Sequence, residues 1–283
     1  MASPQATVVT VDHVYIVTGA GRGLGRSIAK VVAKRAAAAN ELRHLILVGR
    51  SRRSLELTSE EAVNTHTRTY IAADIELSQP AETTTEQVIA KIKEVVGGLS
   101  ASPKRTLHIT LIQCAGTVGD LSKTVDQYTE SEITAYVHLN LVSYSALTAR
   151  FLEYAKTLAH ADRIAVVNIS SLLAVVPFPN WGLYAAIKAA RDQILKVVAL
   201  EHKGDPRVKT LSYAPGPLEG DMQADVRNSI GDAEQKALYS EMHKEKKLVN
   251  REFTADLMCG LLDKWSFESG AHIDIYDVSP PPS

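Results

Sequence analysis

Short apolar runs alternate with longer amphipathic stretches along almost the whole chain. A short apolar run between turn signals predicts a buried strand, and such runs occupy residues 13–17, 44–48, 69–73, 107–112, 164–169, 208–214 and 271–276. Apolar residues at helical spacing predict helices at 24–38, 82–96, 129–158, 184–201 and 254–263. Strands that alternate with helices predict an α/β fold, a parallel doubly wound sheet with helices on both faces.

The ends of these elements carry signals that support the boundaries. Thr129 and Glu132 have the spacing of a capping box, and Gly97 with Gly98 marks a helix end. Residues 218–250 are polar and charged with short helical pieces, which is typical of a mobile substrate lid rather than a second domain. The proline-rich tail at 278–283 is expected to be disordered. The sequence shows no linker or internal repeat, so we expect a single domain over residues 1–283.

Composition is that of a soluble globular protein and argues against several classes of partner. Hydrophobic residues make up 45% of the chain and charged residues 22%, which is enough for a sizeable core. The formal net charge of −1 gives no reason to expect a nucleic acid or an anionic membrane as partner. The N-terminus lacks a basic signal region, and no stretch approaches about 18 uncharged apolar residues. We therefore expect a cytoplasmic protein without a membrane span.

The cysteines and histidines form no metal-binding pattern. Cys114 and Cys259 lie far apart without metal or redox spacing, and the nine histidines form no HExxH-type motif. The two thiols are most simply explained as small buried residues in a reducing compartment. No metal site is expected.

A glycine-rich segment, TGAGRGLG at residues 18–25, separates the first expected strand from the first expected helix. Its glycines allow a tight turn, close approach of the backbone to a pyrophosphate and close packing of the helix. The following helix N-terminus offers free N–H groups to phosphates. The spacing is neither the common GxGxxG nor a P-loop, but the position between strand and helix indicates dinucleotide binding. The candidate cofactor-binding residues of this segment are Gly19, Ala20, Gly21, Arg22, Gly23, Leu24 and Gly25.

The charge after the second strand distinguishes between the two nicotinamide dinucleotides. NAD binders usually carry an acid there, which accepts a hydrogen bond from the ribose 2′-hydroxyl. This chain has Gly49, Arg50, Ser51, Arg52 and Arg53 in that place, and Arg22 adds a guanidinium in the glycine loop. Guanidinium groups pair with phosphate, so NADP(H) is preferred over NAD(H). The alternative is a solvated basic loop without a ligand.

A tyrosine and a lysine offer acid–base chemistry near the middle of the chain. Tyr184 and Lys188 stand four residues apart and share one helical face, where an ammonium lowers the pKa of a phenol from about 10. Ser171 ends the preceding strand, and we prefer it to Ser170, which is expected to face the opposite side. A phenol so placed can exchange a proton with a reacting carbonyl. About 0.6 such tyrosine–lysine pairs are expected by chance, so the pair needs support from other motifs.

The motifs together resemble the short-chain dehydrogenase/reductase family over the whole chain. The matches are the glycine loop, Asp74 after the third strand, Asn140 in the fourth helix, Ser171, Tyr184 with Lys188, and Pro215-Gly216 after the sixth strand. The resemblance implies a single Rossmann-like domain, hydride transfer from NADPH to a ketone, and a homodimer formed through the fourth and fifth helices.

The resemblance also implies a role for each matching residue. Tyr184 gives a proton to the carbonyl oxygen, Ser171 polarises it, Lys188 binds the nicotinamide ribose, and Asn140 maintains a proton relay through water. Further cofactor-binding positions follow from the family pattern: Arg50, Ser51, Ala73, Asp74, Ala115, Gly116, Tyr184, Lys188, Leu218 and Met222.

A narrower likeness, to the sepiapterin reductase branch of that family, concerns the substrate. It is carried by the segment around Ser171 and Tyr184, by SYAPGPLEGDMQ at 212–223, by TVGDLSK at 117–123 and by SGAHIDIYD near the C-terminus. It implies that Asp274 anchors a pterin, whose amino-pyrimidine edge presents adjacent N–H donors to a carboxylate. Gly216 then admits the substrate close to the backbone, and Trp181 lines the pocket. Alternatively, Asp274 is an ordinary strand-end acid and Trp181 a packing residue.

Two departures from the family pattern and two competing functions stay open. Gln113 and Cys114 stand where the family usually has two asparagines, and Gly220 replaces a serine or threonine that touches the nicotinamide amide. The substrate can be another ketone, such as an aromatic or aliphatic 1,2-diketone. A non-catalytic dinucleotide sensor is disfavoured because the tyrosine and lysine are both retained.

Overall fold

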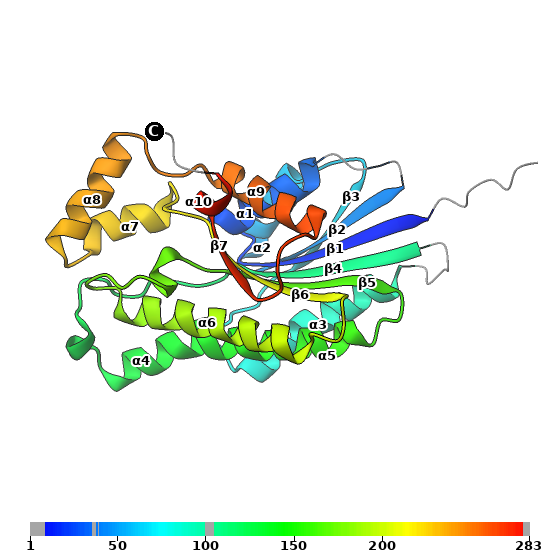
Figure 1. Ribbon diagram of the computed structural model, residues 1–283, viewed down its shortest axis with the longest axis horizontal. Helices are drawn as coiled ribbons and strands as arrows, with labels where there is room; N and C mark the ends of the chain where they lie inside the picture. Colours follow the sequence, from blue (N-terminus) through cyan, green and yellow to red (C-terminus); the bar gives the residue numbers. More distant parts are fainter. Residues whose placement is uncertain (1–8, 36–37, 39, 100–104, 280–283) are drawn as a thin grey trace, which may run out of the picture.

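The computed structural model describes residues 9–35, 38, 40–99 and 105–279, and its centre is a seven-stranded sheet (Figure 1). The strand order is β3-β2-β1-β4-β5-β6-β7, and every neighbouring pair is parallel. The strands are β1 (Thr10–Thr18), β2 (Glu41–Val48), β3 (Thr67–Ala72), β4 (Arg105–Gln113), β5 (Ala161–Ile169), β6 (Val208–Ala214) and β7 (Ala271–Asp274). The predicted parallel doubly wound sheet is confirmed.

Both faces of the sheet are buried, which explains why the strands read as continuous apolar runs. Along β1, Val14 and Ile16 pack into the core on one face, whereas Tyr15 and Val17 pack into the core on the other. This alternation follows from the two-residue period of a strand. The sheet therefore separates two hydrophobic cores and needs helices on each side.

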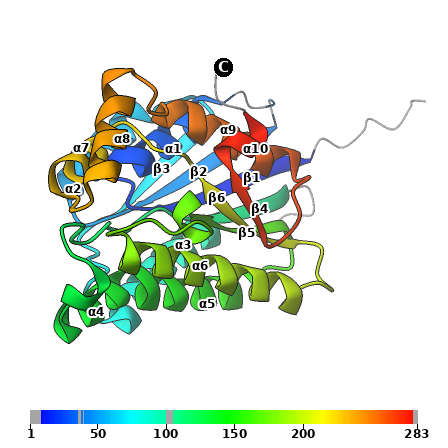
Figure 2. The same cartoon turned by 60° about the vertical axis from the view of Figure 1, so that its left-hand side comes forward.

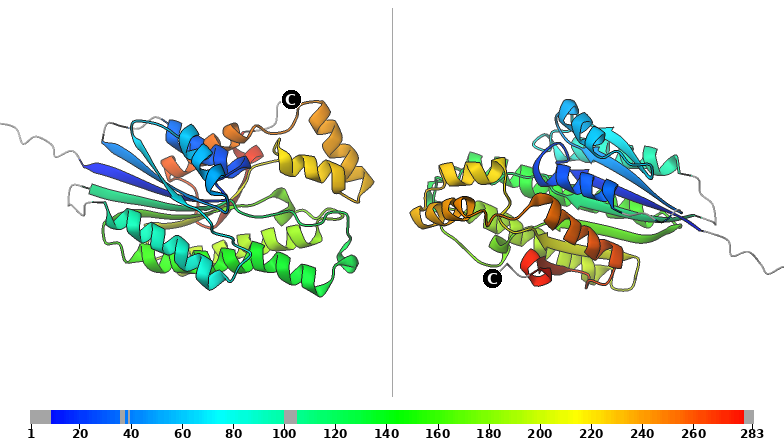
Figure 3. Two further views of the ribbon diagram at one scale, coloured as in Figure 1. Left: turned by 180° about the vertical axis from the view of Figure 1, so that it is seen from behind. Right: turned by 90° about the horizontal axis from the view of Figure 1, so that it is seen from above.

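Helices cover both faces of the sheet (Figures 1 and 3). One side carries α3 (Ala81–Gly97), α4 (Glu130–Val137), α5 (Ser143–Lys156) and α6 (Gly182–Glu201). The other side carries α1 (Gly23–Lys34), α2 (Arg52–Glu61) and α9 (Arg251–Lys264). The remaining helical segments are α7 (Asp221–Ser229), α8 (Ala233–Lys244), α10 (Ile275–Val278), the 3₁₀ turns η1 (Val125–Gln127) and η3 (Leu172–Ala174), and the π-helical turn η2 (His138–Val142).

The predicted lid corresponds to α7 and α8, which project beyond the carboxyl ends of the strands (Figures 1 and 2). Its base is closed by backbone hydrogen bonds, from Val249 N to Pro217 O at 2.8 Å and from Glu219 N to Val249 O at 3.3 Å. The two ends of the segment thus lie side by side next to β6.

Two elements differ from the expectations. The helix α2 was not expected, because only Leu55 and Thr58 of it are buried and no apolar stripe marks it. The long helix expected at 129–158 is present as α4, η2 and α5, which follow one another without a gap and contain one π turn. The last strand ends at Asp274 rather than at residue 276, because the Asp274 side chain caps α10.

Two further expectations concern the termini and the membrane. Val278 of the expected tail belongs to α10, and residues 280–283 lie outside the described residues. Among the helices of the described chain, none is both long and apolar enough to cross a membrane.

The carboxyl ends of the parallel strands meet at one edge of the sheet. The connections after β1 and β4 leave towards opposite faces, so a crevice opens between these two neighbouring strands. Ligands of open α/β sheets bind at such a switch point. The glycine loop after β1 and the segments after β4, β5 and β6 all converge there.

Candidate active site

The glycine loop after β1 has the geometry that its sequence predicts. Gly19 has a φ of +70°, and a Cβ there would lie 3.0 Å from the Ala115 Cα of the neighbouring loop. A Cβ at Gly25 would lie 2.3 Å from the Gly19 oxygen, so α1 packs directly on the turn. Gly23 has a φ of +55°, and its Cβ position meets no described atom within 4 Å. The loop is therefore closed towards the protein and open above Gly23.

The N-terminus of α1 follows this open position. Arg22 is the N-cap residue, and its side chain makes no capping hydrogen bond to the described part of the helix. Ala20 is fully buried and Leu24 packs partly into the core, so both anchor the loop. The first N–H groups of α1 can therefore bind an anion.

The predicted nucleotide side lies around the ends of β2 and β3. The Arg50 side chain is 67% exposed, and its Nη1 lies 3.2 Å from Glu76 Oε2. The Ser51 hydroxyl accepts from Ser54 N at 3.2 Å and caps α2. Asp74, which follows Ala73, has a φ of +62° and pairs with Arg52 at 3.2 Å. These groups form an exposed rim beside the glycine loop.

Ser171, Tyr184 and Lys188 come together although they lie on two elements. Ser171 follows β5, and the other two occupy the first two turns of α6. The Ser171 hydroxyl accepts from Leu173 N at 3.2 Å and lies near enough to Tyr184 to lower the pKa of that phenol. The Lys188 Nζ lies 5.3 Å from the centroid of the Tyr184 ring and donates to the backbone oxygen of Ile169 at 2.5 Å. The predicted grouping of these three side chains is thus present.

The two acid–base groups are both pushed towards their neutral forms. Burial raises the pKa of Tyr184 to about 12, while the Ser171 hydrogen bond and the charge of Arg191 act in the opposite direction. Burial lowers the pKa of Lys188 to about 7, and Arg191 adds to this effect. The expected lowering of the pKa of Tyr184 by Lys188 is therefore wrong, because desolvation penalises the charged form of both groups.

The preference for Ser171 over Ser170 is supported by the direction of the two side chains. The Ser170 hydroxyl is buried and donates to Asp192 Oδ2 at 2.9 Å. It therefore faces away from Tyr184, as the alternation along the strand end predicts.

Asn140 lies inside the π turn η2 rather than in a regular helix. Its side chain is buried: Oδ1 accepts from Thr117 N and Nδ2 donates to Tyr136 O, both at 3.1 Å. Its backbone oxygen accepts from Arg191 Nε. A π turn widens the helix locally and frequently occurs at functional sites. The backbone carbonyl of Asn140 is thus bonded to a guanidinium, and its role in a proton relay stays a prediction.

The expected substrate end lies where β6 and β7 end side by side, with Asp274 paired in register with Ala214. Asp274 Oδ1 accepts from Tyr276 N at 3.0 Å and so caps α10. A Cβ at Gly216 would lie 3.0 Å from side-chain atoms of both Ile275 and Val249. Side chains of Ile275 and Val249 therefore border the Cβ position of Gly216, and the approach of a substrate to its backbone stays a prediction.

Trp181 packs between the start of α6 and the lid helix α8. It is 4% exposed, and its ring lies edge-on to Tyr184 at 5.3 Å and to Tyr239 of α8 at 6.2 Å. Leu218 is half-buried at the base of the lid, and Met222, at the start of α7, is 49% exposed. The lid therefore covers the tyrosine side of the crevice.

A comparison with known proteins decides the family. Residues 13–231 match the family described as short chain dehydrogenase. The chain belongs to the short-chain dehydrogenase/reductase family. It is an oxidoreductase of that family.

The chain is similar to reductases of two kinds and to solved structures of the same fold. Sepiapterin reductase of Rattus norvegicus is 35% identical over 269 residues, which cover 94% of this chain and 97% of the relative. Benzil reductase ((S)-benzoin forming) of Bacillus cereus is 28% identical over 262 residues, covering 92% and 98%. The structure of L-sorbose reductase from Gluconobacter frateurii, solved with NADPH and L-sorbose, superposes with a TM-score of 0.74 at 18% identity, covering 95% and 97%. This last likeness concerns the fold.

The departures from the family pattern are compensated locally. Gln113 Nε2 donates to Tyr144 O at 3.2 Å and to Thr148 Oγ1 at 2.7 Å, which fixes the end of β4 to α5. At Gly220, a Cβ would lie 3.3 Å from Arg251 Nη1. The Arg251 guanidinium thus occupies the space that a larger residue at Gly220 requires.

Three residues that the sequence analysis did not single out belong to the site. Thr18 Oγ1 accepts from the backbone N–H groups of both Cys114 and Ala115 at 3.1 Å and so joins the glycine loop to the loop after β4. Arg26 Nη2 donates to Gly21 O at 2.6 Å and its Nε to Thr58 Oγ1 of α2 at 3.2 Å. Arg191 contacts Asn140. Thr18 could have been found from the sequence, because it directly precedes the glycines. Arg26 could not, because its partner Thr58 lies in α2, which the sequence did not predict.

Proposed function

We propose that the protein is an NADPH-dependent ketone reductase that acts on the keto side chain of a pterin, sepiapterin or a 6-pyruvoyl-tetrahydropterin. The arrangement of Ser171, Tyr184 and Lys188 beside the glycine loop carries the proposal of carbonyl reduction. The 35% identity to rat sepiapterin reductase over 94% of the chain favours a pterin.

The chain's own groups account for the proton chemistry of a reduction. NADPH, when bound, supplies the hydride that reaches the carbonyl carbon. Ser171 donates a hydrogen bond to the carbonyl oxygen and polarises it. Tyr184, whose pKa is raised to about 12 by burial, is protonated at neutral pH and donates its proton to the same oxygen. Lys188, whose burial lowers its pKa to about 7, can return a proton to Tyr184.

The described residues fit a dinucleotide with a 2′-phosphate. Gly23 and the N-terminus of α1 leave room and N–H groups for the pyrophosphate. Arg50 lies beside the N-terminus of α2, so a guanidinium and a helix dipole favour an anion at the same place. Exposed ion pairs contribute at most about 1 kcal/mol, so Arg50 can exchange Glu76 for a phosphate.

Asp274 is proposed as the pterin anchor. Capping of α10 occupies Oδ1, and a carboxylate has about four acceptor positions, so acceptor capacity is left for a ligand. Near Tyr184, the buried Nε1 of Trp181 has no hydrogen-bond partner among the described residues, nor have Arg227 Nη1 and Gln235 Oε1 on the lid helices. Unpaired buried polar atoms favour a polar heterocycle over an apolar substrate.

The test follows NADPH oxidation with sepiapterin and with a simple 1,2-diketone, in wild type and in Asp274→Ala. We expect kcat/KM for sepiapterin to fall about tenfold to a hundredfold in Asp274→Ala, because a charged hydrogen bond to the substrate is lost. The kcat/KM for the diketone should stay unchanged. Asp277→Ala is the matched control, because Asp277 accepts from Asp274 N at 2.8 Å and completes the same cap. An equal loss with both substrates in both variants would mean that Asp274 only caps the helix.

A 1,2-diketone reductase is the second candidate, and the 28% identity to the Bacillus cereus benzil reductase supports it. If the wild-type protein prefers the diketone in the same assay, the protein is a 1,2-diketone reductase. If wild type turns over no carbonyl at all, the protein is a dinucleotide sensor and not a reductase.

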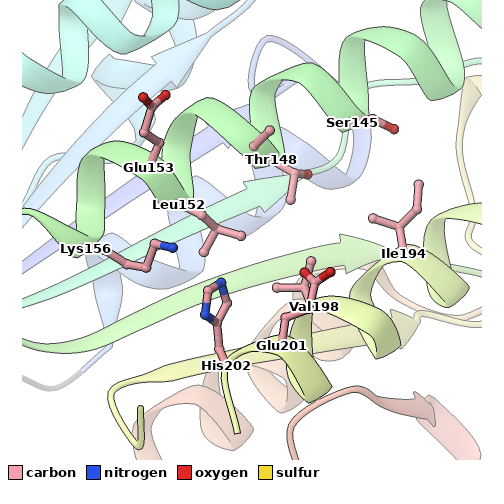
Figure 4. A pocket seen from close by; sticks show the side chains of 10 residues that line it. Ser145, Thr148, Leu152, Glu153, Lys156, Ile194, Val198, Glu201 and His202 are labelled. Atoms are coloured by element: carbon pink, nitrogen blue, oxygen red, sulfur yellow. The ribbon is translucent and has the colours of Figure 1, made fainter. Parts of the chain in front are cut away.

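A homodimer is proposed through the outer face of α5 and α6. A hollow of about 460 Å³ lies between these helices, lined by Ser145, Leu152, Ile194 and Val198 (Figure 4). Its rim carries acidic and basic side chains, Glu153 and Glu201 beside Lys156 and His202, which can pair across a twofold axis (Figure 4). Nearby Leu200 is 73% exposed. Sedimentation equilibrium should give twice the 30.7 kDa chain mass, and a monomer at micromolar concentration contradicts the proposal.

A further inference from the structure

A buried guanidinium lies beside the catalytic lysine. Arg191 is 2% exposed and stands three residues after Lys188 on α6. Its Nε donates to the Asn140 oxygen at 2.5 Å, and its Cζ lies 4.6 Å from the centroid of the Tyr144 ring. Within the described residues no carboxylate forms an ion pair with it. A buried charge without a partner is costly, so this arrangement needs an explanation.

The surroundings of Arg191 contain groups that titrate but no free acid. Tyr136 of α4, Tyr144 of α5, Tyr184 of α6 and Cys114 after β4 are the titratable groups that act on it. The neighbouring Asp192 accepts hydrogen bonds from Asn168, Ser170 and His272 at 2.9, 2.9 and 2.6 Å. The charge of Asp192 is thus directed towards the side of α6 that faces β5 and β7.

The guanidinium also borders the cofactor loop after β4. A Cβ at Gly116 would lie 2.9 Å from Asn140 Oδ1 and 4.0 Å from Arg191 Nη2. Arg191 therefore holds the π turn η2 against α6 through the Asn140 carbonyl, directly behind a loop that is expected to line the cofactor.

We propose that Arg191 is a positioning residue of the reductase: it fixes the Asn140 carbonyl and the π turn η2 behind the loop after β4, and its charge acts on Lys188 and Tyr184 of the same helix. The role in turnover rests on the proposed function. The charge-dependent role on Lys188 is a property of the chain itself and can be measured without a substrate.

The electrostatics agree with the geometry. Burial lowers the pKa of Lys188 first and Arg191 lowers it further, whereas Cys114 and Asp192 act in the opposite direction. On Tyr184, burial raises the pKa, Ser171 and Arg191 lower it, and Tyr239 and Cys114 raise it. Burial lowers the pKa of Arg191 as well, but a guanidinium starts from so high a pKa that it stays protonated near neutral pH. It can therefore act as the fixed cation while Lys188 gives up and regains a proton.

The test compares Arg191→Met and Arg191→Gln, which remove the charge, with Arg191→Lys, which keeps it. The midpoint for titration of the Lys188 Nζ is measured by ¹⁵N-lysine NMR and assigned with Lys188→Met. We expect a wild-type midpoint of about 7, an increase of about one pH unit in the neutral variants, and most of the shift restored by lysine. Where sepiapterin or a diketone is turned over, the limb of the kcat–pH profile that belongs to Lys188 should move in the same direction.

Arg43→Met is the matched control, since Arg43 is 5% exposed and its Nη1 donates to Arg35 O at 2.7 Å in the amino-terminal half of the sheet. It should reduce stability without moving the Lys188 midpoint. An unchanged midpoint in a folded Arg191→Met or Arg191→Gln protein overturns the inference and leaves Arg191 a packing residue. A shifted midpoint without any carbonyl turnover contradicts the proposed function alone.

Discussion

The two ends of the central sheet treat buried charge in opposite ways. At the amino ends of the strands, Asp12 is 3% exposed, accepts two hydrogen bonds from Arg105 at 2.7 Å, and lies 3.1 Å from His44 Nε2. At the carboxyl ends, Lys188 and Arg191 donate to backbone carbonyl oxygens instead of carboxylates. The Asp12 carboxylate is thus neutralised by cationic partners, whereas Lys188 and Arg191 are held by uncharged carbonyl oxygens, which leaves their charge available to a reaction.

The pKa shifts express the same difference. Burial raises the pKa of Asp12, but hydrogen bonds from His44 and Arg105 outweigh it and hold the pKa at about 2. For Lys188 nothing outweighs burial, and its pKa falls to about 7. Paired charges keep their ordinary ionisation and support the fold, whereas perturbed groups in a crevice are the ones that exchange protons near neutral pH.

The largest expected effect is at the carboxyl end, in Tyr184→Phe. Reduction should fall about a thousandfold, the usual contribution of a positioned proton donor, while affinity for NADPH and the free energy of unfolding stay close to wild type. Steady-state kinetics and a fluorescence titration with NADPH measure the two quantities. A variant that keeps more than a tenth of the activity would show that another group delivers the proton.

The next effect is at the amino end, in Asp12→Ala. Removing one partner of a buried ion pair leaves Arg105 uncompensated and should cost about 3 kcal/mol of unfolding free energy, with kcat unchanged. Urea unfolding measures it. Asp162→Ala is the matched control at the same end, because Asp162 is exposed and, within the described part of the chain, accepts a side-chain hydrogen bond only from Thr106 Oγ1, at 2.8 Å. A similar loss of unfolding free energy in both variants would mean that the buried ion pair of Asp12 stabilises the fold no more than an exposed carboxylate does.

The pH dependence of that stability has a definite sign. The pKa of Asp12 is lower in the folded state, so the unfolded chain binds the proton first. The contribution of Asp12 is complete above its unfolded pKa of about 3.9 and is lost as the pH falls towards 2. Asp12→Ala should therefore have a flatter stability curve between these values. An unchanged slope in the variant contradicts the pairing.

The sequence predicts the sheet well because the inner strands β2, β1, β4, β5 and β6 are largely buried and read as apolar runs. It does not predict α2, whose two buried residues leave no stripe, or the turn at Asp274, where a side-chain cap ends the strand although Ile273 and Ile275 keep the alternation. The pattern of apolar and polar residues predicts which elements are buried, but it does not predict individual hydrogen bonds.

The residues of the candidate site were likewise predicted only in part. Spacing on one helix is enough to bring Tyr184 and Lys188 together, and the strand end fixes Ser171. The pKa of Tyr184 was predicted with the wrong sign because the sequence does not show that both groups are desolvated. Arg191 was missed because its partner, the Asn140 carbonyl, reaches it only through the π turn between α4 and α5.

The smallest expected effect is at the exposed rim of the carboxyl end, in Arg50→Asp. Its ion pair with Glu76 lies in water, where charges are screened, so the change should lower NADPH affinity only about tenfold and raise relative affinity for NADH. Arg53→Asp is the matched control, since Arg53 is 71% exposed and pairs with Glu60 at 3.9 Å. Equilibrium titration with both cofactors distinguishes the outcomes: equal losses for NADPH and NADH mean that Arg50 shapes the loop, whereas a loss confined to NADPH means that it binds the 2′-phosphate. A rim charge can select the cofactor because it is exposed and free to exchange partners, whereas the buried cations behind it are held in fixed positions.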